Sequence, residues 1–387
     1  MRVLFDYQAF EMQRFGGVSR SYAELISHLK KGESVNCTIG IKESDNVHLK
    51  ECRLDSNVKS LHYTHKKWFE RKKWFKGQRT LTRKIMRIAG HENDGLNINQ
   101  EYCIKLLKKQ QFDIFEPTFF GPYFLPYLNG KTFVLTVHDM IPELLDVDKP
   151  QAELKQLLCP LATHIHVPSQ NTKDDLIRIM GIPSEKITVI PHGAPEIPPK
   201  RKPIFDFPYL LYVGARGSYK SFEPFTTECT DIISQHPDLN VICTGEPFSD
   251  EELKMLCKLG IREHVVNMPH VSEEQLQALY QHAIAFVYPS AYEGFGIPIL
   301  EAFVNGCPVL LNNASCFPEI GGDAAIYFDI NRKGDLAEHI MELLQYSEEE
   351  RQQIIDKGTQ RAKCFSWEES AHKLKQVYEN IQHASTQ

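Results

Sequence analysis

Two glutamates, Glu293 and Glu301, frame the stretch of this sequence whose residue types could do the most chemistry. Between them, Gly294–Pro298 follows an apolar run and combines the glycines of a turn with a proline suited to the first turn of a helix. Such a turn lets a ligand approach the backbone, and the helix dipole favours an anion there. Glu293 would lie at the carboxyl end of a strand, where open α/β sheets bind ligands. Glu301, about one turn into the helix, could accept hydrogen bonds from hydroxyl groups.

A second candidate site combines two cations with a glycine turn. The apolar run Tyr209–Val213 is followed by Gly214, and Arg216 and Lys220 come next. Two fixed cations beside the end of a strand suit a diphosphate, because they neutralise the charge that grows when a bond to it breaks. The alternative is a pair of solvent-exposed cations in a loop.

The first half of the chain offers two further candidates at the ends of predicted strands. Gly16 and Gly17 open a helical pattern, so that the backbone could approach a ligand at the helix N-terminus. A plain loop hinge is the alternative for this pair. His138 ends the apolar run Thr132–Val137 and is followed by Asp139, a place that favours a functional histidine over a structural one.

Short apolar runs alternate with helical patterns along the chain and would position these residues. Continuous rather than alternating apolarity is typical of strands that are covered on both faces. The predicted strands are Val3–Phe5, Thr132–Val137, Ile165–Val167, Ile187–Ile190, Tyr209–Val213, Asn240–Cys243, Val265–Met268, Ala283–Tyr288 and Pro308–Leu311. The sequence therefore predicts an α/β protein with two units that each contain a parallel sheet.

A proline-rich segment marks the predicted domain boundary. Four prolines occur between Pro195 and Pro203, without a hydrophobic period. We expect an N-terminal domain over 1–195, a linker over 196–206 and a C-terminal domain over 207–365. Ser366–Glu369 has the form of a capping box, which predicts a final amphipathic helix over 366–387.

The bulk composition excludes several classes of protein. The formal net charge of −6 argues against nucleic-acid binding by the molecule as a whole. None of the 10 cysteines forms a CxxC pair, so neither a zinc site nor a redox motif is indicated. The opening apolar run is too short for a signal peptide, and no run is long enough for a transmembrane helix. The cytoplasm is therefore the expected compartment.

One basic and aromatic segment stands apart from this pattern. Residues 66–87 contain ten Lys or Arg residues and one acid, with Trp68, Phe69, Trp74 and Phe75 among them. A solvated loop with local aromatic packing is one interpretation. The other is peripheral contact with anionic lipid at the inner face of the plasma membrane.

Taken together, these motifs resemble those of the retaining GT-B glycosyltransferases of family 4, over nearly the whole chain from Phe15 to the region of Trp367. The resemblance implies two Rossmann-like domains whose parallel sheets face each other across a cleft. It implies that 1–195 lies on the acceptor side, that 207–365 binds the nucleotide sugar, and that the final helix over 366–387 crosses back to the N-terminal domain. The frame Glu293-x7-Glu301 resembles the family's signature. The resemblance implies that Glu301 holds the ribose of a nucleotide-sugar donor and that Glu293 contacts the donor sugar. It also implies backbone contacts to the sugar and diphosphate from the intervening turn, at Gly294, Phe295, Gly296 and Ile297.

The other candidates receive roles from the same resemblance. It implies that Arg216 and Lys220 stabilise the leaving diphosphate, and that the Gly16–Gly17 loop lies where donor phosphate and acceptor meet. His138 would contact the donor sugar close to the reacting carbon. His192 stands where asparagine is more usual in the family, and no role is assigned to it. The family mechanism is front-face attack, in which the leaving phosphate accepts the proton of the acceptor.

The donor and acceptor are less closely defined. The chain looks similar to bacterial mannosyl- and rhamnosyl-type transferases of surface polysaccharide synthesis, which favours a GDP-linked donor over a UDP-linked one and a saccharide or lipid-linked saccharide acceptor. No cofactor is expected, and Asp146-Val-Asp148 is interpreted as solvated surface rather than a metal site. Two alternatives remain, a nucleotide-sugar epimerase of the same fold and a non-catalytic nucleotide-sugar-binding subunit.

Overall fold

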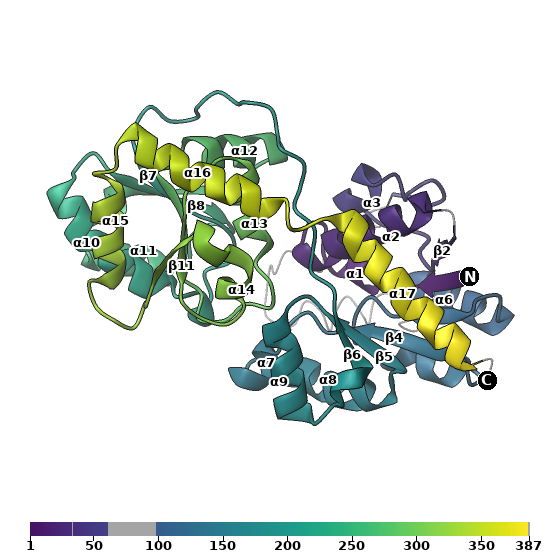
Figure 1. Cartoon of the computed structure of the whole chain (residues 1–387). Coiled ribbons are helices and arrows are strands. Elements are labelled where there is room, and N and C mark those ends of the chain that lie inside the picture. The colour runs from purple at the N-terminus through teal and green to yellow at the C-terminus, as the bar shows by residue number, and fades with distance from the viewer. Residues whose placement is uncertain (33, 61–97, 386–387) are drawn as a thin grey trace, which may run out of the picture. The chain divides into compact units, whose positions relative to one another are not determined.

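The computed structural model describes residues 1–32, 34–60 and 98–385. Over these residues the chain forms two six-stranded sheets whose paired strands run parallel, each flanked by helices (Figure 1). The predicted α/β class with two Rossmann-like sheets is thereby confirmed. The basic and aromatic segment 66–87 lies outside the described residues.

The first sheet has the strand order β2-β1-β3-β4-β5-β6. Its strands are β1 (Arg2–Phe5), β2 (Asn36–Ile39), β3 (Ile114–Glu116), β4 (Thr132–Thr136), β5 (His164–Val167) and β6 (Ile187–Val189). The helices in this part of the chain are α1 (Gln8–Met12), α2 (Gly17–Lys31), α3 (Val47–Glu51), α6 (Ile98–Lys109), α7 (Ile141–Leu144), α8 (Lys149–Leu161) and α9 (Gln170–Met180). Short 3₁₀ turns occur at Pro122–Tyr127 and Ser184–Lys186.

The second sheet has the strand order β12-β11-β10-β7-β8-β9. Its strands are β7 (Tyr209–Tyr212), β8 (Asn240–Gly245), β9 (Val265–Pro269), β10 (Ala285–Tyr288), β11 (Val309–Asn312) and β12 (Ile326–Phe328). The helices are α10 (Phe222–Gln235), α11 (Asp250–Lys258), α12 (Glu273–His282), α13 (Ile297–Val304), α14 (Phe317–Gly321), α15 (Asp335–Leu343), α16 (Glu348–Ala362) and α17 (Trp367–Ser385). Further 3₁₀ turns lie at Ser218–Lys220, Arg262–His264 and Gly322–Ala324.

Alternate residues of the central strand β7 face two separate hydrophobic cores. Tyr209 and Leu211 pack with residues of α12, α13 and α14, whereas Leu210 and Tyr212 pack with residues of α10, α11 and α15. Figure 1 shows these two groups of helices on opposite faces of the second sheet. Both faces are covered, and this explains why the strand reads as an unbroken apolar run.

By contacts the chain divides into two compact units that do not follow the sequence halves. One unit contains Met1–Thr136, Leu157–His164 and Tyr378–Gln387, and the other contains Val137–Gln156 and Ile165–Val377. Within the first unit, the Tyr378 hydroxyl near the end of α17 donates a 2.5 Å hydrogen bond to Glu116 Oε2 at the end of β3. The domain boundaries taken from the sequence stay a prediction.

Three strands were not predicted from the sequence, namely β2, β3 and β12. Two of them have only three residues, and β2 is largely exposed, so their apolar signal is weak. All 10 cysteines are free thiols. In the described part of the chain, no helix combines the length and apolar character needed to cross a membrane.

Candidate active site

The loops that follow β7 and β10 meet because these two strands are neighbours in the sheet. Ala285 and Phe286 of β10 lie beside Leu210 and Leu211 of β7. Beyond the carboxyl ends of the strands, the Ala291 N–H donates to the Tyr219 carbonyl at 2.8 Å. The Lys220 ammonium, at the end of the first loop, forms an ion pair with the Glu293 carboxylate in the second. Two predicted site residues far apart in sequence are therefore in direct contact.

The Lys220–Glu293 pair is largely shielded from water. The side chains are 15% and 11% exposed, respectively. Burial lowers the pKa of Lys220, but the charge and hydrogen bond of Glu293 outweigh it, so the net pKa of the ammonium is raised. The aromatic rings of Tyr219 and Tyr288 lie 5.0 and 5.8 Å from the Lys220 Nζ and add cation–π contacts. Lys220 is thus a fixed cation.

The main chain of Glu293 is fixed by residues that the sequence analysis missed. Its N–H donates to Ser315 Oγ at 3.0 Å, and Ser315 Oγ and Cys316 Sγ lie 3.2 Å from its carbonyl oxygen. Both residues follow β11, the other neighbour of β10. A serine and a cysteine after an apolar run carry no sequence signal for this role, since only the strand order brings them here.

The glycine turn after Glu293 is packed against the segment that carries His138. A Cβ added to Gly294 would lie 1.9 Å from the His138 carbonyl oxygen and 2.9 Å from Cβ of Asp139, so only glycine fits. Gly296 has φ 95° and caps α13, and Ile297 is the first residue of that helix. Pro298 is the second residue of α13 and therefore lies in its first turn, as predicted. The predicted strand–turn–helix arrangement is present.

His138 lies in a cluster of aromatic rings that includes His192. The two imidazole centroids are 6.3 Å apart, and the His192 ring lies 4.8 Å from Phe295 and 5.6 Å from Trp367. Burial, helped by the nearby His192, His166 and Lys155, lowers the pKa of His138 well below its usual range. Burial, with a smaller effect of His166, lowers the pKa of His192 to about 3. Both imidazoles are therefore neutral at pH 7.

The N-terminal turn of α9 also contacts the glycine turn, a role that the sequence did not reveal. Thr172 Oγ1 donates to the Gly294 carbonyl at 3.3 Å, and Asn171 Nδ2 donates to the Tyr292 hydroxyl at 3.1 Å. The Tyr292 hydroxyl in turn donates to Asp175 Oδ2 at 2.7 Å. Polar residues at the start of a helix usually cap it, so in the sequence these residues indicate a helix cap and no further role.

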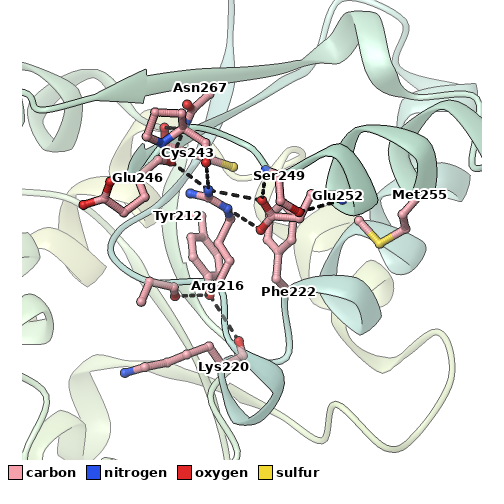
Figure 2. Close-up of polar contacts among 12 residues, drawn as sticks. Tyr212, Arg216, Lys220, Phe222, Cys243, Glu246, Ser249, Glu252, Met255 and Asn267 are labelled. Atoms are coloured by element: carbon pink, nitrogen blue, oxygen red, sulfur yellow. Dashed lines mark hydrogen bonds and ion pairs between the residues drawn. The ribbon is translucent and has the colours of Figure 1, made fainter. Parts of the chain in front are cut away.

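Arg216 is held in a different environment from Lys220. Its Nε donates to Glu252 Oε1 at 2.7 Å, and its Nη2 donates to the Glu246 carbonyl at 2.7 Å. Figure 2 shows the guanidinium among these groups, while the Lys220 ammonium points elsewhere. The two cations predicted beside the end of this strand are therefore held by different carboxylates, and their contact with a diphosphate stays a prediction. Glu252 was missed, because in sequence it has the appearance of a helix-capping residue.

Glu301 lies one turn into α13, as expected from its spacing. Its Oε2 accepts a 3.3 Å hydrogen bond from the Tyr280 hydroxyl of α12. It also lines a small pocket together with Pro195, Pro198 and Asn305. Glu301 thus has neighbours distinct from those of Glu293, and a role in ribose binding stays a prediction.

The Gly16–Gly17 loop belongs to the first compact unit. Gly17 is the first residue of α2, and the Gly16 carbonyl accepts hydrogen bonds from Ser19 Oγ at 3.1 Å and from the Arg20 N–H at 3.0 Å. The glycines therefore open the helix as the sequence predicted. Their predicted place beside the donor phosphate is not tested by contacts within this unit.

The acidic residues considered for a metal site lie on the surface. Asp146 is 80% exposed at its side chain and pairs with Lys149 at 3.3 Å. Across the residues that the structure describes, no group of three or more His, Cys, Asp or Glu side chains could hold a metal ion.

The class of protein follows from the fold. Sucrose-phosphate synthase from Thermosynechococcus elongatus superposes with a TM-score of 0.70 at 15% identity, covering 99% of this chain and 100% of its own. The Anabaena protein HepE, crystallised with UDP and glucose, gives a TM-score of 0.71 at 15% identity, with 98% and 99% covered. Together with the two parallel six-stranded sheets, these similarities define a protein of the GT-B fold.

The family follows from the sequence matches. Residues 15–196 match Glycosyltransferase Family 4, and residues 194–361 match Glycosyl transferases group 1. The Escherichia coli O-antigen chain mannosyltransferase B is 31% identical over 277 residues, which cover 64% of this chain and 70% of that protein. The Salmonella typhimurium mannosyltransferase RfbU is 29% identical over 210 residues, covering 52% and 58%. The chain belongs to glycosyltransferase family 4 and is a glycosyltransferase.

Proposed function

We propose that the protein is a retaining transferase that moves a mannose-type hexose from a nucleotide diphosphate to a saccharide or lipid-linked saccharide during cell-surface polysaccharide synthesis. The observation that carries the proposal is the shielded Lys220–Glu293 pair beside the Gly294 turn. The pair offers an ammonium for a phosphate and a carboxylate for a sugar hydroxyl within one contact. The relatives named O-antigen mannosyltransferases support the choice of sugar and process.

In this mechanism the bond between the anomeric carbon and the diphosphate oxygen breaks with its electron pair leaving on that oxygen. The acceptor hydroxyl attacks the same face of the sugar and gives its proton to the departing phosphate. Lys220 stabilises the charge that develops on the leaving group, and Glu293 orients the sugar and favours positive charge on it. His138, neutral because burial lowers its pKa, would contact the sugar without adding a competing cation.

The relatives and the structural neighbours point to different donor bases. The mannosyltransferase relatives favour GDP, whereas HepE was crystallised with UDP and glucose. A thermal-shift screen against GDP-, UDP-, ADP- and dTDP-sugars would identify the donor, because a ligand that binds the folded state raises the melting temperature. We expect the largest shift with a GDP-linked hexose. A shift with a UDP-sugar alone would transfer the assignment to UDP.

Transfer with the selected donor then tests the reaction itself. We expect a product whose anomeric configuration, determined by NMR, matches that of the donor, and activity that persists in EDTA because no metal is invoked. Inversion would refute the retaining mechanism. Epimerisation of the nucleotide sugar without acceptor would replace the transferase by an epimerase, and donor binding without either reaction would indicate a binding subunit. Membrane contact through residues 66–87 and a cytoplasmic location stay predictions, which liposome co-sedimentation and cell fractionation test.

A further inference from the structure

Arg216 is bound on several sides by its own protein. Its Nε and Nη2 donate to the two Glu252 carboxylate oxygens at 2.7 and 3.3 Å. Nη2 also lies 2.7 Å from the Glu246 carbonyl and 3.1 Å from the Pro247 carbonyl, and Nη1 lies 3.4 Å from the Thr244 carbonyl. The side chain is only 5% exposed. Figure 2 shows the guanidinium close to the labelled residues Glu246 and Glu252.

These contacts join two loops that follow neighbouring parallel strands. Arg216 comes from the loop after β7, and its carbonyl acceptors lie at the end of β8, at Thr244, and in the loop that follows, at Glu246 and Pro247. The loops also touch through their backbones, because a Cβ added to Gly245 would lie 2.6 Å from the Gly214 carbonyl oxygen. Ligands of open α/β sheets bind at this edge. Arg216 therefore fixes the relative position of two ligand-side loops.

The Glu252 carboxylate accepts hydrogen bonds from two residues, Ser249 and Arg216. As the third residue of α11 it accepts from the Ser249 N–H at 2.7 Å, and its own N–H donates to Ser249 Oγ at 3.2 Å. The same carboxylate binds Arg216 through both oxygens, the geometry in which guanidinium–carboxylate pairs are strongest. Burial raises the pKa of Glu252, but the hydrogen bonds from Arg216 and Ser249 outweigh it and hold the pKa below its usual range. The carboxylate is thus charged at neutral pH.

The hydrogen-bond count limits what Arg216 can offer to a ligand. A guanidinium has five N–H groups, and Nε, Nη2 and one N–H of Nη1 are directed at the acceptors named above. Within the described residues, that leaves one N–H of Nη1 for a phosphate oxygen. Such a residue needs to be aimed, since a small rotation would remove its one remaining donor from the ligand.

We propose that Glu252 is a positioning residue for the donor, which acts by aiming Arg216 and joining the two loops against the nucleotide diphosphate. The proposal rests on the proposed function, because the ligand is the donor of that reaction. It extends the site to a residue that touches neither sugar nor phosphate. Phe222 and Phe248, whose rings lie 5.7 and 4.8 Å from the guanidinium carbon, confine the same side chain.

The test compares Glu252→Gln, Arg216→Ala and the double variant in binding of UDP and GDP by calorimetry and in transfer kinetics. Loss of the carboxylate should weaken nucleoside diphosphate binding about tenfold and raise KM more than it lowers kcat. In the Arg216→Ala background, Glu252→Gln should have no further effect, because Glu252 acts through Arg216. Ser249→Ala is the matched control, since it removes the Oγ of the cap and leaves the contact with Arg216 in place.

Five outcomes separate the possibilities. Unchanged affinity and KM in Glu252→Gln would overturn the inference, and so would losses that add in the double variant. An equal loss in Ser249→Ala would overturn it as well, because the effect would then come from the cap of α11. A wild-type chain that binds neither UDP nor GDP and transfers no sugar would refute the proposed function, and the positioning role with it. Wild-type binding with a tenfold loss only when Arg216 is present supports the proposal.

Discussion

Removing one member of the Lys220–Glu293 pair should destabilise the protein more than removing both. The pair is only 15% and 11% exposed, so each single variant leaves a shielded charge without its partner. Full burial of an unpaired charge costs about 3–5 kcal/mol, and the remaining exposure reduces this to about 2 kcal/mol for Lys220→Met. In the double variant Lys220→Met/Glu293→Gln no charge is left behind, and the loss should fall below about 1 kcal/mol.

Urea unfolding at pH 7 measures these differences, with sugar transfer assayed on the same samples. Because the pKa of Lys220 is raised in the folded state, its pairing contributes stability at neutral pH, and this is lost only as the pH rises through that pKa. Transfer should be lost in all three variants, even where stability returns. A double variant as unstable as the sum of the single ones would refute the reasoning, since the two charges would then not be coupled.

Two further predictions concern the same compact unit. Gly294→Ala should cost about 1–3 kcal/mol of unfolding free energy in urea titrations, because its Cβ would meet the His138 carbonyl oxygen at 1.9 Å; Gly217→Ala, whose Cβ meets open space, should change stability by less than about 0.5 kcal/mol. Lowering the pH from 7 to 5 should reduce the free energy of unfolding by about 2 kcal/mol through His192. The folded-state pKa of His192 is about 3, so in this pH range only the unfolded chain takes up a proton on this imidazole. His192→Asn should remove this part of the acid loss in urea titrations, and an unaltered pH dependence would show that His192 does not stay neutral.

The sequence predicted the fold well where the strands are buried on both faces. β7 and β10 are fully apolar, and both were found with their ends within a few residues. The strands β3 and β12 have three residues each, too few for a period to show. The exposed residues of β2 break the apolar run that a covered strand would have. The strands that the sequence did not predict are therefore those that depend on pairing with a neighbouring strand rather than on a local apolar pattern.

The candidate site was predictable only in part for a related reason. Glu293, Lys220 and Arg216 each follow a strand, and that place in the sequence marked them. Ser315 also follows a strand, and Glu252 lies in the first turn of a helix, but a loop serine and a helix-capping glutamate occur in most proteins and indicate no role in a site. Only the order of neighbouring strands shows that one holds the main chain of Glu293 and the other holds Arg216.

Arg216 and Lys220 each have their own carboxylate partner, and this pairing limits the ways in which the site could bind its donor. Arg216 is balanced by Glu252 and Lys220 by Glu293, so these four groups together carry no net charge. Bulk attraction between opposite charges therefore contributes little to donor affinity at this point. What remains is directional: one N–H of Arg216, and the N–H groups of the Lys220 ammonium that Glu293 does not accept. Because such donors act only when aimed, we expect residues that orient the cations, such as Glu252, to contribute to donor binding alongside the cations themselves.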